Sequence, residues 1–177
     1  GSTPNPTYEL TQIAIDGTLK VKKSFGPGFS KFVEIRKDRV YVAGYKPNVV
    51  FGGSVINVFD NQLNQLREII IPESSIEAFA ADYSGHIYVH TWEDFGKSIY
   101  KIKEDGTIIW RSQLGYDFLS LEVFEDGKIA GLVRDKGDLD KLRDRLILVE
   151  WFPDSEIPTI DDSHIVINHL PLPIKLI

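Results

Sequence analysis

The sequence predicts an all-β fold built from a four-stranded antiparallel unit that recurs along the chain. Residues 86–90 and 98–103 both alternate between polar and apolar side chains, which is typical of half-buried strands. Turn signals, Tyr83-Ser84-Gly85 and Asp105-Gly106, precede and follow these runs. Glycine accepts the positive φ that a tight hairpin turn requires, so we expect an antiparallel meander over 80–114.

The same turns recur at a fixed period. Asp16, Asp60 and Asp105 each follow an alternating run and lie 44 and 45 residues apart. A second series of turn-plus-strand segments repeats at 37–42, 83–89 and 125–131, and each is preceded by an apolar run, at 32–35, 76–80 and 119–124. A repeat of this length indicates an array of equivalent structural units.

Each unit is predicted to contain four strands. In the first full unit they are residues 32–36, 40–43, 55–60 and 66–71, the second unit covers 76–114, and the third begins near 118 and includes 146–151. The segment 8–25 supplies only the last two strands of an earlier unit. Four antiparallel strands every roughly 40–45 residues are the signature of a β-propeller blade, so we predict a β-propeller-like fold of roughly 3.5–4 blades, as a small ring or a partial propeller.

The ends of the chain are expected to lie outside the blades. Residues 1–7 have the composition of a tag scar and linker, 8–152 would form the blades, and 153–177 would be a proline-bearing tail that acts as a closing or edge strand. Within the tail, 163–168 is a candidate strand. Helical spacing occurs only at 138–143, in a short segment.

Two phrases resemble known propeller repeats. The segment 105–110, Asp-Gly-Thr-Ile-Ile-Trp, is similar to the turn-plus-tryptophan ending of PQQ-like and arylsulfotransferase-like blades. The segment 83–89, Tyr-Ser-Gly-His-Ile-Tyr-Val, resembles a phrase of NHL and related bacterial six-bladed propellers. Because Val21 and Gln65 stand where the other repeats would carry the closing tryptophan, the resemblance implies the fold but no PQQ cofactor.

Composition narrows the classes of function. The net charge of −6 argues against nucleic acid as the main partner, because phosphate binding needs a basic surface. No apolar run approaches the roughly 20 residues of a membrane-spanning helix. The absence of cysteine excludes disulfides and thiolate chemistry and leaves the compartment open, although we favour an extracytoplasmic one. No phosphate-binding loop, nucleophile elbow or metal-binding histidine pair is present, and we expect neither a metal nor a cofactor.

The best candidate binding site lies on the loops between the second and third strands of each blade. These loops, 44–54, 91–97 and 134–145, are longer and more diverse than the tight turns, and long loops on one face of a rigid scaffold are the usual place for function. Aromatic rings near carboxylates suit a protein or glycan partner. The predicted partner-binding residues are Tyr45, Phe51, Trp92, Asp94, Phe95 and Arg134.

Three functions are compatible with this pattern. The first is a non-catalytic binding or assembly module that presents its loop face to protein or glycan, which the lack of a catalytic constellation favours. The second is a fragment of a sulfotransferase-like or lyase-like propeller enzyme whose catalytic residues lie in other blades. The third is a structural domain of a surface or virion protein. An open propeller fragment would expose unpaired strand edges, but the proline-bearing tail leads us to expect a monomer.

Overall fold

The computed structural model describes residues 7–47, 53–72, 74–93, 96–114, 117–135 and 145–151, and every regular element in these ranges is a β-strand. The thirteen strands are β1 (Tyr8–Ile13), β2 (Leu19–Phe25), β3 (Phe29–Arg36), β4 (Arg39–Lys46), β5 (Gly53–Asp60), β6 (Gln65–Pro72), β7 (Ser74–Ala81), β8 (His86–Glu93), β9 (Gly96–Lys103), β10 (Ile108–Leu114), β11 (Asp117–Val123), β12 (Ile129–Asp135) and β13 (Arg145–Trp151). Among the described residues, no helix is long and apolar enough to cross a membrane.

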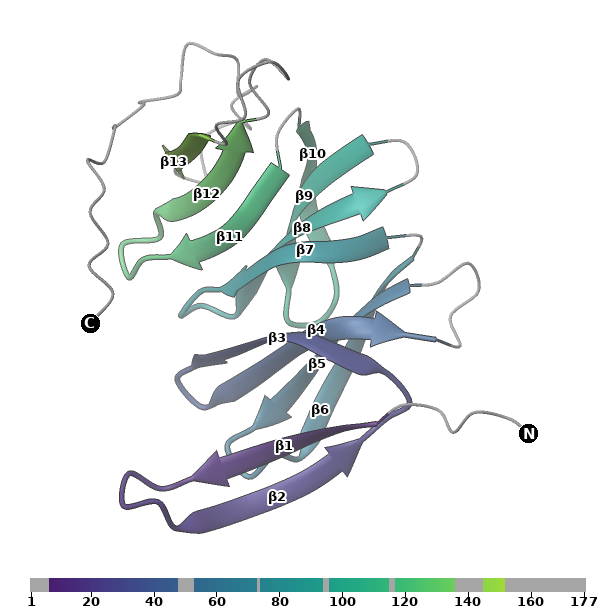
Figure 1. Cartoon of the computed structure of the whole chain (residues 1–177), viewed down its shortest axis with the longest axis vertical. Coiled ribbons are helices and arrows are strands. Elements are labelled where there is room, and N and C mark those ends of the chain that lie inside the picture. Colours follow the sequence, from purple (N-terminus) through teal and green to yellow (C-terminus); the bar gives the residue numbers. More distant parts are fainter. Residues whose placement is uncertain are drawn as a thin grey trace.

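The strands form four antiparallel sheets in chain order. The orders are β1-β2, β3-β4-β5-β6, β7-β8-β9-β10 and β11-β12-β13, so each sheet is a simple meander. Figure 1 shows the sheets following one another along the long axis, from β1-β2 at the bottom to β11-β13 at the top. We call them the half blade, blade 1, blade 2 and blade 3. This confirms the all-β fold of four-stranded antiparallel blades and the half unit at 8–25.

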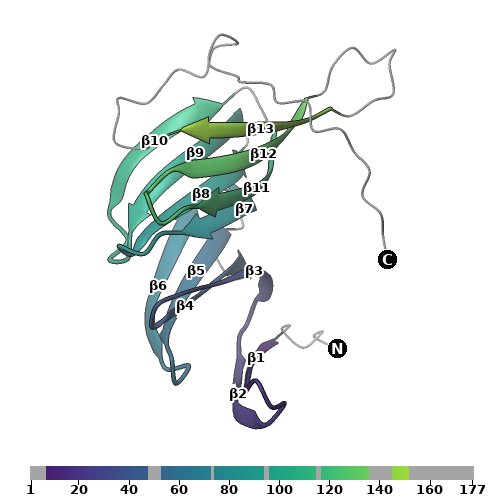
Figure 2. The ribbon, with the colours of Figure 1, turned by 90° about the vertical axis from the view of Figure 1, so that its left-hand side faces the viewer.

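The inner strands connect consecutive blades. Strand β7 contacts β3, β4 and β5 of blade 1 on one side and β11 of blade 3 on the other. The turned view in Figure 2 shows the same succession of sheets, with the half blade at the lower end. The predicted helix at 138–143 and the predicted strand at 163–168 lie outside the described residues.

Apolar residues on both faces of the middle strands build the core. The cluster between blades 1 and 2 includes Tyr41 and Val58 from one sheet and Ile87 and Val89 from the other. Side chains alternate between the two faces of a strand, so the neighbouring residues of β8 point to the other side of blade 2, toward blade 3. Tyr88 accordingly packs in the cluster between blades 2 and 3.

The predicted burial of the second strand of each blade is confirmed. Val42, Ile87, Val89 and Ile129 are all buried. Because a blade between two others has no solvent face, its central strands are apolar in nearly continuous runs, as in any sheet covered on both sides.

The turn between the third and fourth strands shows where the predicted repeat register was wrong. Gly17, Leu63 and Gly106 are the structurally equivalent residues, because each donates its backbone N–H to the carbonyl three positions earlier and each has a positive φ. The sequence alignment had instead matched Asp60 with Asp16, which places blade 1 two residues out of register.

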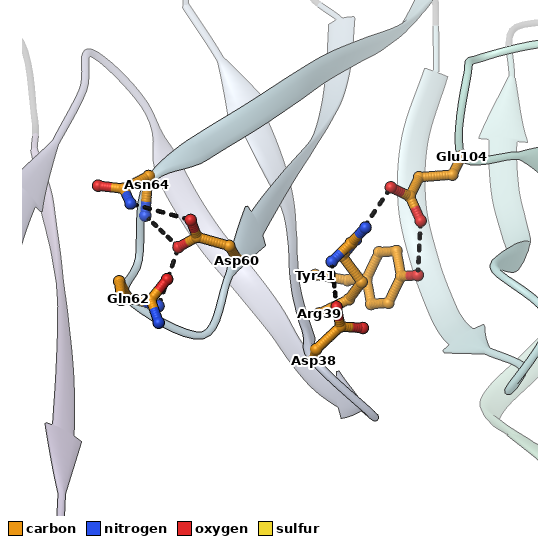
Figure 3. Close-up of polar contacts among 7 residues, drawn as sticks. All are labelled: Asp38, Arg39, Tyr41, Asp60, Gln62, Asn64 and Glu104. Carbon is orange, nitrogen blue, oxygen red and sulfur yellow. Dashed lines mark hydrogen bonds and ion pairs between the residues drawn. The ribbon is translucent and has the colours of Figure 1, made fainter.

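The cause is the residue that occupies the left-handed position. Leu63 has φ 59°, a conformation that glycine adopts more easily, so no Asp-Gly pair marks this turn. The carboxylate of Asp60 supports the turn instead. It accepts hydrogen bonds from the backbone N–H of Gln62 (2.9 Å) and of Asn64 (2.8 Å), as Figure 3 shows on its left side.

A β-bulge also recurs in the innermost strand of every blade. The register shifts at Lys31 in β3, at Glu77 in β7 and at Leu119 in β11. The first two bulge residues are paired, with 2.8 Å between the Lys31 Nζ and a carboxylate oxygen of Glu77. The bulge is therefore part of the repeated structure, and the ion pair between two bulge residues helps to join blades 1 and 2.

Candidate functional site

Two predicted site residues lie at the same ends of equivalent strands. Tyr45 is the last residue but one of β4, and Trp92 is the last but one of β8. In Figure 1 both strands end at the right, opposite the turns that join β3 to β4 and β7 to β8. The side chains are 42% and 56% exposed, respectively, so both rings are available to a partner.

These rings stand on strands, whereas the sequence had predicted loops. Strand β8 continues to Glu93 and β9 begins at Gly96, where the backbone has φ 139°. The pairing therefore continues past the predicted loop boundary at Thr91. As a result Trp92 lies opposite Lys97, whose ammonium group is 5.5 Å from the centre of the ring.

The two rings point into different gaps. Tyr45 lies on the same side of β4 as Tyr41 and Ala43, which face blade 2. Trp92 lies on the same side of β8 as Tyr88, which faces blade 3. They share one end of the molecule without forming a single cluster.

The remaining predicted residues are only partly placed. Arg134 lies on β12, where its backbone is opposite Asp117 and Leu146. Phe51, Asp94 and Phe95 lie outside the described residues.

A third ring, which was not predicted, lies at this end of the blades. Phe29 is 58% exposed and lies directly opposite Tyr45 on the neighbouring strand. It escaped prediction because β3 begins at Phe29, three residues before the predicted strand. The Gly26-Pro27-Gly28 segment immediately before it was the available signal for a strand start.

A pocket of about 260 Å³ opens between the half blade and blade 1, on the face of β4 opposite to the one that carries the Tyr45 ring. Its walls come from the ends of β1 and β2, the 26–28 connection, and strands β4 to β6. The lining residues are Tyr8, Ser24, Phe25, Gly26, Pro27, Gly28, Lys46, Val55, Asn57, Gln65 and Glu68.

A chain of side-chain hydrogen bonds orders the pocket. The Gln65 amide nitrogen donates to the Asn57 carbonyl oxygen (2.8 Å), and the Asn57 amide nitrogen donates to the Tyr8 hydroxyl (3.0 Å). Burial raises the pKa of Tyr8, the Asn57 hydrogen bond opposes this, and the charge of Glu68 adds to it. Tyr8 therefore remains a neutral hydroxyl at physiological pH. At the mouth, Lys46 and Glu68 form an ion pair of 2.6 Å.

At the opposite, tight-turn end, polar contacts join the blades. Glu104, in the β9-β10 turn, accepts hydrogen bonds from the Arg39 Nε (3.1 Å) and from the Tyr41 hydroxyl (3.4 Å) of blade 1, as Figure 3 shows on its right side. Burial, followed by the charge of Glu104, raises the pKa of Tyr41. These groups satisfy one another, so this cluster is structural.

A second polar cluster joins the innermost strands. The Arg36 guanidinium contacts the carboxylates of Glu34 (2.6 Å) and Glu122 (2.5 Å) and donates to the Ala81 carbonyl oxygen (2.9 Å). Burial raises the pKa of Glu34, although Arg36 opposes the shift. Because Arg36 is already shared between two carboxylates, this cluster fixes β3, β7 and β11 and offers no free anion site.

The described residues contain no group of three or more histidine, aspartate or glutamate side chains that could hold a metal ion. His86 is instead hydrogen-bonded to the Asp82 carboxylate at 2.9 Å, beside the β7-β8 turn. The same carboxylate accepts the backbone N–H groups of Ser84 and His86 (both 2.8 Å), which makes it a turn-stabilising group.

Comparison with known proteins yields a similarity to solved structures alone. No protein-family model matches the chain, and no curated protein matches it. Among solved structures, the chain is similar to the β-propeller domain of Cps50 (Swd1) from Myceliophteria thermophila, with 15% identity and a TM-score of 0.43. The match covers 70% of this chain and 38% of that domain, so the chain spans well under half of its length.

Proposed function

We propose that this chain is a non-catalytic binding or assembly module that docks a protein or glycan at the strand ends opposite the tight turns. The observation that carries the proposal is the exposure of three aromatic rings at that end, Phe29, Tyr45 and Trp92. Aromatic side chains provide large apolar area at little entropic cost and often dominate the energy of an interface.

The opposite end is built differently. Its turns are tight and their polar groups bind one another, as in the contacts of Glu104 with Arg39 and Tyr41. A rigid scaffold with self-satisfied turns at one end and exposed rings at the other supports a docking role for the second end.

The test is a pair of substitutions at the rings. The chain is immobilised and its binding to a glycan array and to proteins of a cell extract is compared with that of Trp92→Ala and Tyr45→Ala. Each variant should bind the partner of the wild type more weakly, by at least ~1 kcal/mol of binding free energy, because truncation removes an aromatic anchor. The melting temperature should stay nearly unchanged, because both rings are exposed.

Phe124→Ala is the matched control, because Phe124 is an exposed aromatic residue at the tight-turn end. It should leave binding unchanged. If Phe124→Ala weakens binding as much as Trp92→Ala does, or if Trp92→Ala unfolds the protein, the docking face is assigned wrongly.

A further inference from the structure

We propose that the pocket between the half blade and blade 1 binds one neutral sugar unit of a glycan. The inference rests on the proposed binding function and deepens it by naming the class of ligand. It starts from the place of the pocket, which shares strand β4 with the Tyr45 ring and opens on the other face of that strand. Lys46 follows Tyr45 on β4, and a Cβ atom at Gly28 would lie only 2.7 Å from the Tyr45 carbonyl oxygen. The wall of the pocket and the strand that carries this ring are therefore in direct contact.

The size of the pocket limits the ligand. Pockets for drug-sized molecules measure roughly 300–1,000 Å³, and this one measures about 260 Å³. A single sugar ring fits such a volume.

The polar groups of the lining suit hydroxyls. The Tyr8 hydroxyl accepts the Asn57 hydrogen bond, which leaves its own hydrogen to donate. The Gln65 side-chain nitrogen donates one hydrogen to Asn57. No hydrogen bond to the Gln65 side-chain carbonyl oxygen occurs among the described residues, so this oxygen can accept one from a ligand. Tyr8 thus offers a donor at one end of this hydrogen-bonded series and Gln65 an acceptor at the other, and different hydroxyls of a sugar ring can bind to the two. Asn57 is more than nine-tenths buried, which holds the arrangement in place.

The charges of the lining favour a neutral ligand. Lys46 and Glu68 are the charged residues of the wall and they neutralise each other at 2.6 Å. An anion would be attracted by one partner and repelled by the other, and a cation likewise. A hydroxyl can donate to the carboxylate and accept from the ammonium without breaking the pair. Phe25 and Val55 add apolar wall against which the C–H face of a sugar ring can pack.

The experiment is a titration followed by two-dimensional ¹H–¹⁵N NMR, because the side-chain NH₂ groups of Asn57 and Gln65 report from inside the pocket. The probes are methyl glycosides of glucose, galactose, mannose and N-acetylglucosamine. At least one should shift these two amide signals saturably. Glu68→Gln should then weaken binding by about fivefold or more, since a hydrogen bond to a charged group is lost.

Glu77→Gln is the matched control, because it removes the carboxylate of another ion pair, that with Lys31, away from the pocket. It should leave the affinity unchanged. Gln65→Ala provides a second test should Glu68→Gln fail to fold, and it should also weaken binding. Glycerol at the same concentration should give no saturable shift.

Several results would overturn the proposal: no saturable shift with any of the four glycosides, equal effects of Glu68→Gln and Glu77→Gln, tighter binding of glucuronate than of glucoside, or glycerol shifts matching those of the sugars. The outcome is separable from the docking function. If no sugar binds but Trp92→Ala still weakens binding of the partner, the sugar site is rejected and the docking face is retained. If a sugar binds the pocket while Trp92→Ala and Tyr45→Ala leave partner binding unchanged, the sugar site is retained and the docking face is rejected.

Discussion

Replacing Ile87 with alanine tests the packing of blades 1 and 2 directly. Ile87 lies on β8 with 0% of its surface exposed, in the cluster formed with Val58 and other residues of blade 1. The substitution deletes three carbon atoms, and at about 0.8 kcal/mol for each buried methylene the transfer loss alone is roughly 2.4 kcal/mol. Because the surrounding sheets relax only partly, the cavity raises the expected total to about 2–5 kcal/mol.

The assay is urea unfolding followed by circular dichroism, with the slope of the transition compared between variants. Ile108→Ala is the control, since Ile108 is exposed on β10, and it should cost less than about 0.5 kcal/mol. A loss below about 1 kcal/mol for Ile87→Ala at an unchanged slope would mean that Ile87 is not packed between two sheets, and the face assignment of β8 would be wrong.

Two further predictions concern the contacts between blades 1 and 2 at the tight-turn end. Glu104→Ala should lower the free energy of unfolding by about 1–3 kcal/mol, because the buried Tyr41 hydroxyl loses its acceptor, whereas Glu104→Gln keeps an acceptor and should cost less. Equal losses in urea melts of the two variants would contradict this hydrogen bond. The raised pKa of Tyr41 means that the folded state holds this proton more tightly than the unfolded chain, so its contribution is complete below the ordinary tyrosine pKa of about 10 and is lost as pH rises above it. The unfolding midpoint of the wild type should therefore fall more steeply above about pH 10 than that of Tyr41→Phe, and parallel curves would refute the shift.

The blades were predictable because three independent signals agree in them. Period-two alternation gives the strands, glycine at positive φ gives the turns, and recurrence fixes which strands belong together. Around Ile87 all three signals coincide, with Gly85 at φ 86° directly before the strand. Local preference and tertiary packing therefore point to the same structure over this stretch.

Prediction failed where a side chain replaced a backbone signal. At Leu63 an ordinary residue occupies the left-handed position and Asp60 supplies the supporting hydrogen bonds, so the repeat appeared two residues out of register. The paired bulges at Lys31 and Glu77 are invisible for a similar reason, because a bulge changes the strand register without requiring a particular residue.

The candidate site was predicted in part, and the limit is geometric. An exposed aromatic residue near a strand end is recognisable from sequence, and Tyr45 and Trp92 are both exposed. The side of the strand on which each ring stands depends on the exact register, which the sequence left open by one or two residues. The pocket could not be predicted from the sequence, because Tyr8 and Asn57 are 49 residues apart and meet only when the half blade packs on blade 1.

The innermost strands show that the burial of a repeat position depends on its neighbours as well as on its residue type. Val33, Phe79 and Leu121 each lie two residues after the bulge of their strand and are therefore equivalent. Phe79 and Leu121 are 5% and 6% exposed, because the preceding blade covers them, whereas Val33 is 55% exposed. Val33 lies opposite Val42 and so faces the half blade, whose two strands cover Val42. Among the described residues nothing equivalent to the inner strands of a blade stands over Val33. The repeat thus has an apolar side chain at this position in each blade. Val33 is exposed because the preceding sheet, the half blade, has only two strands.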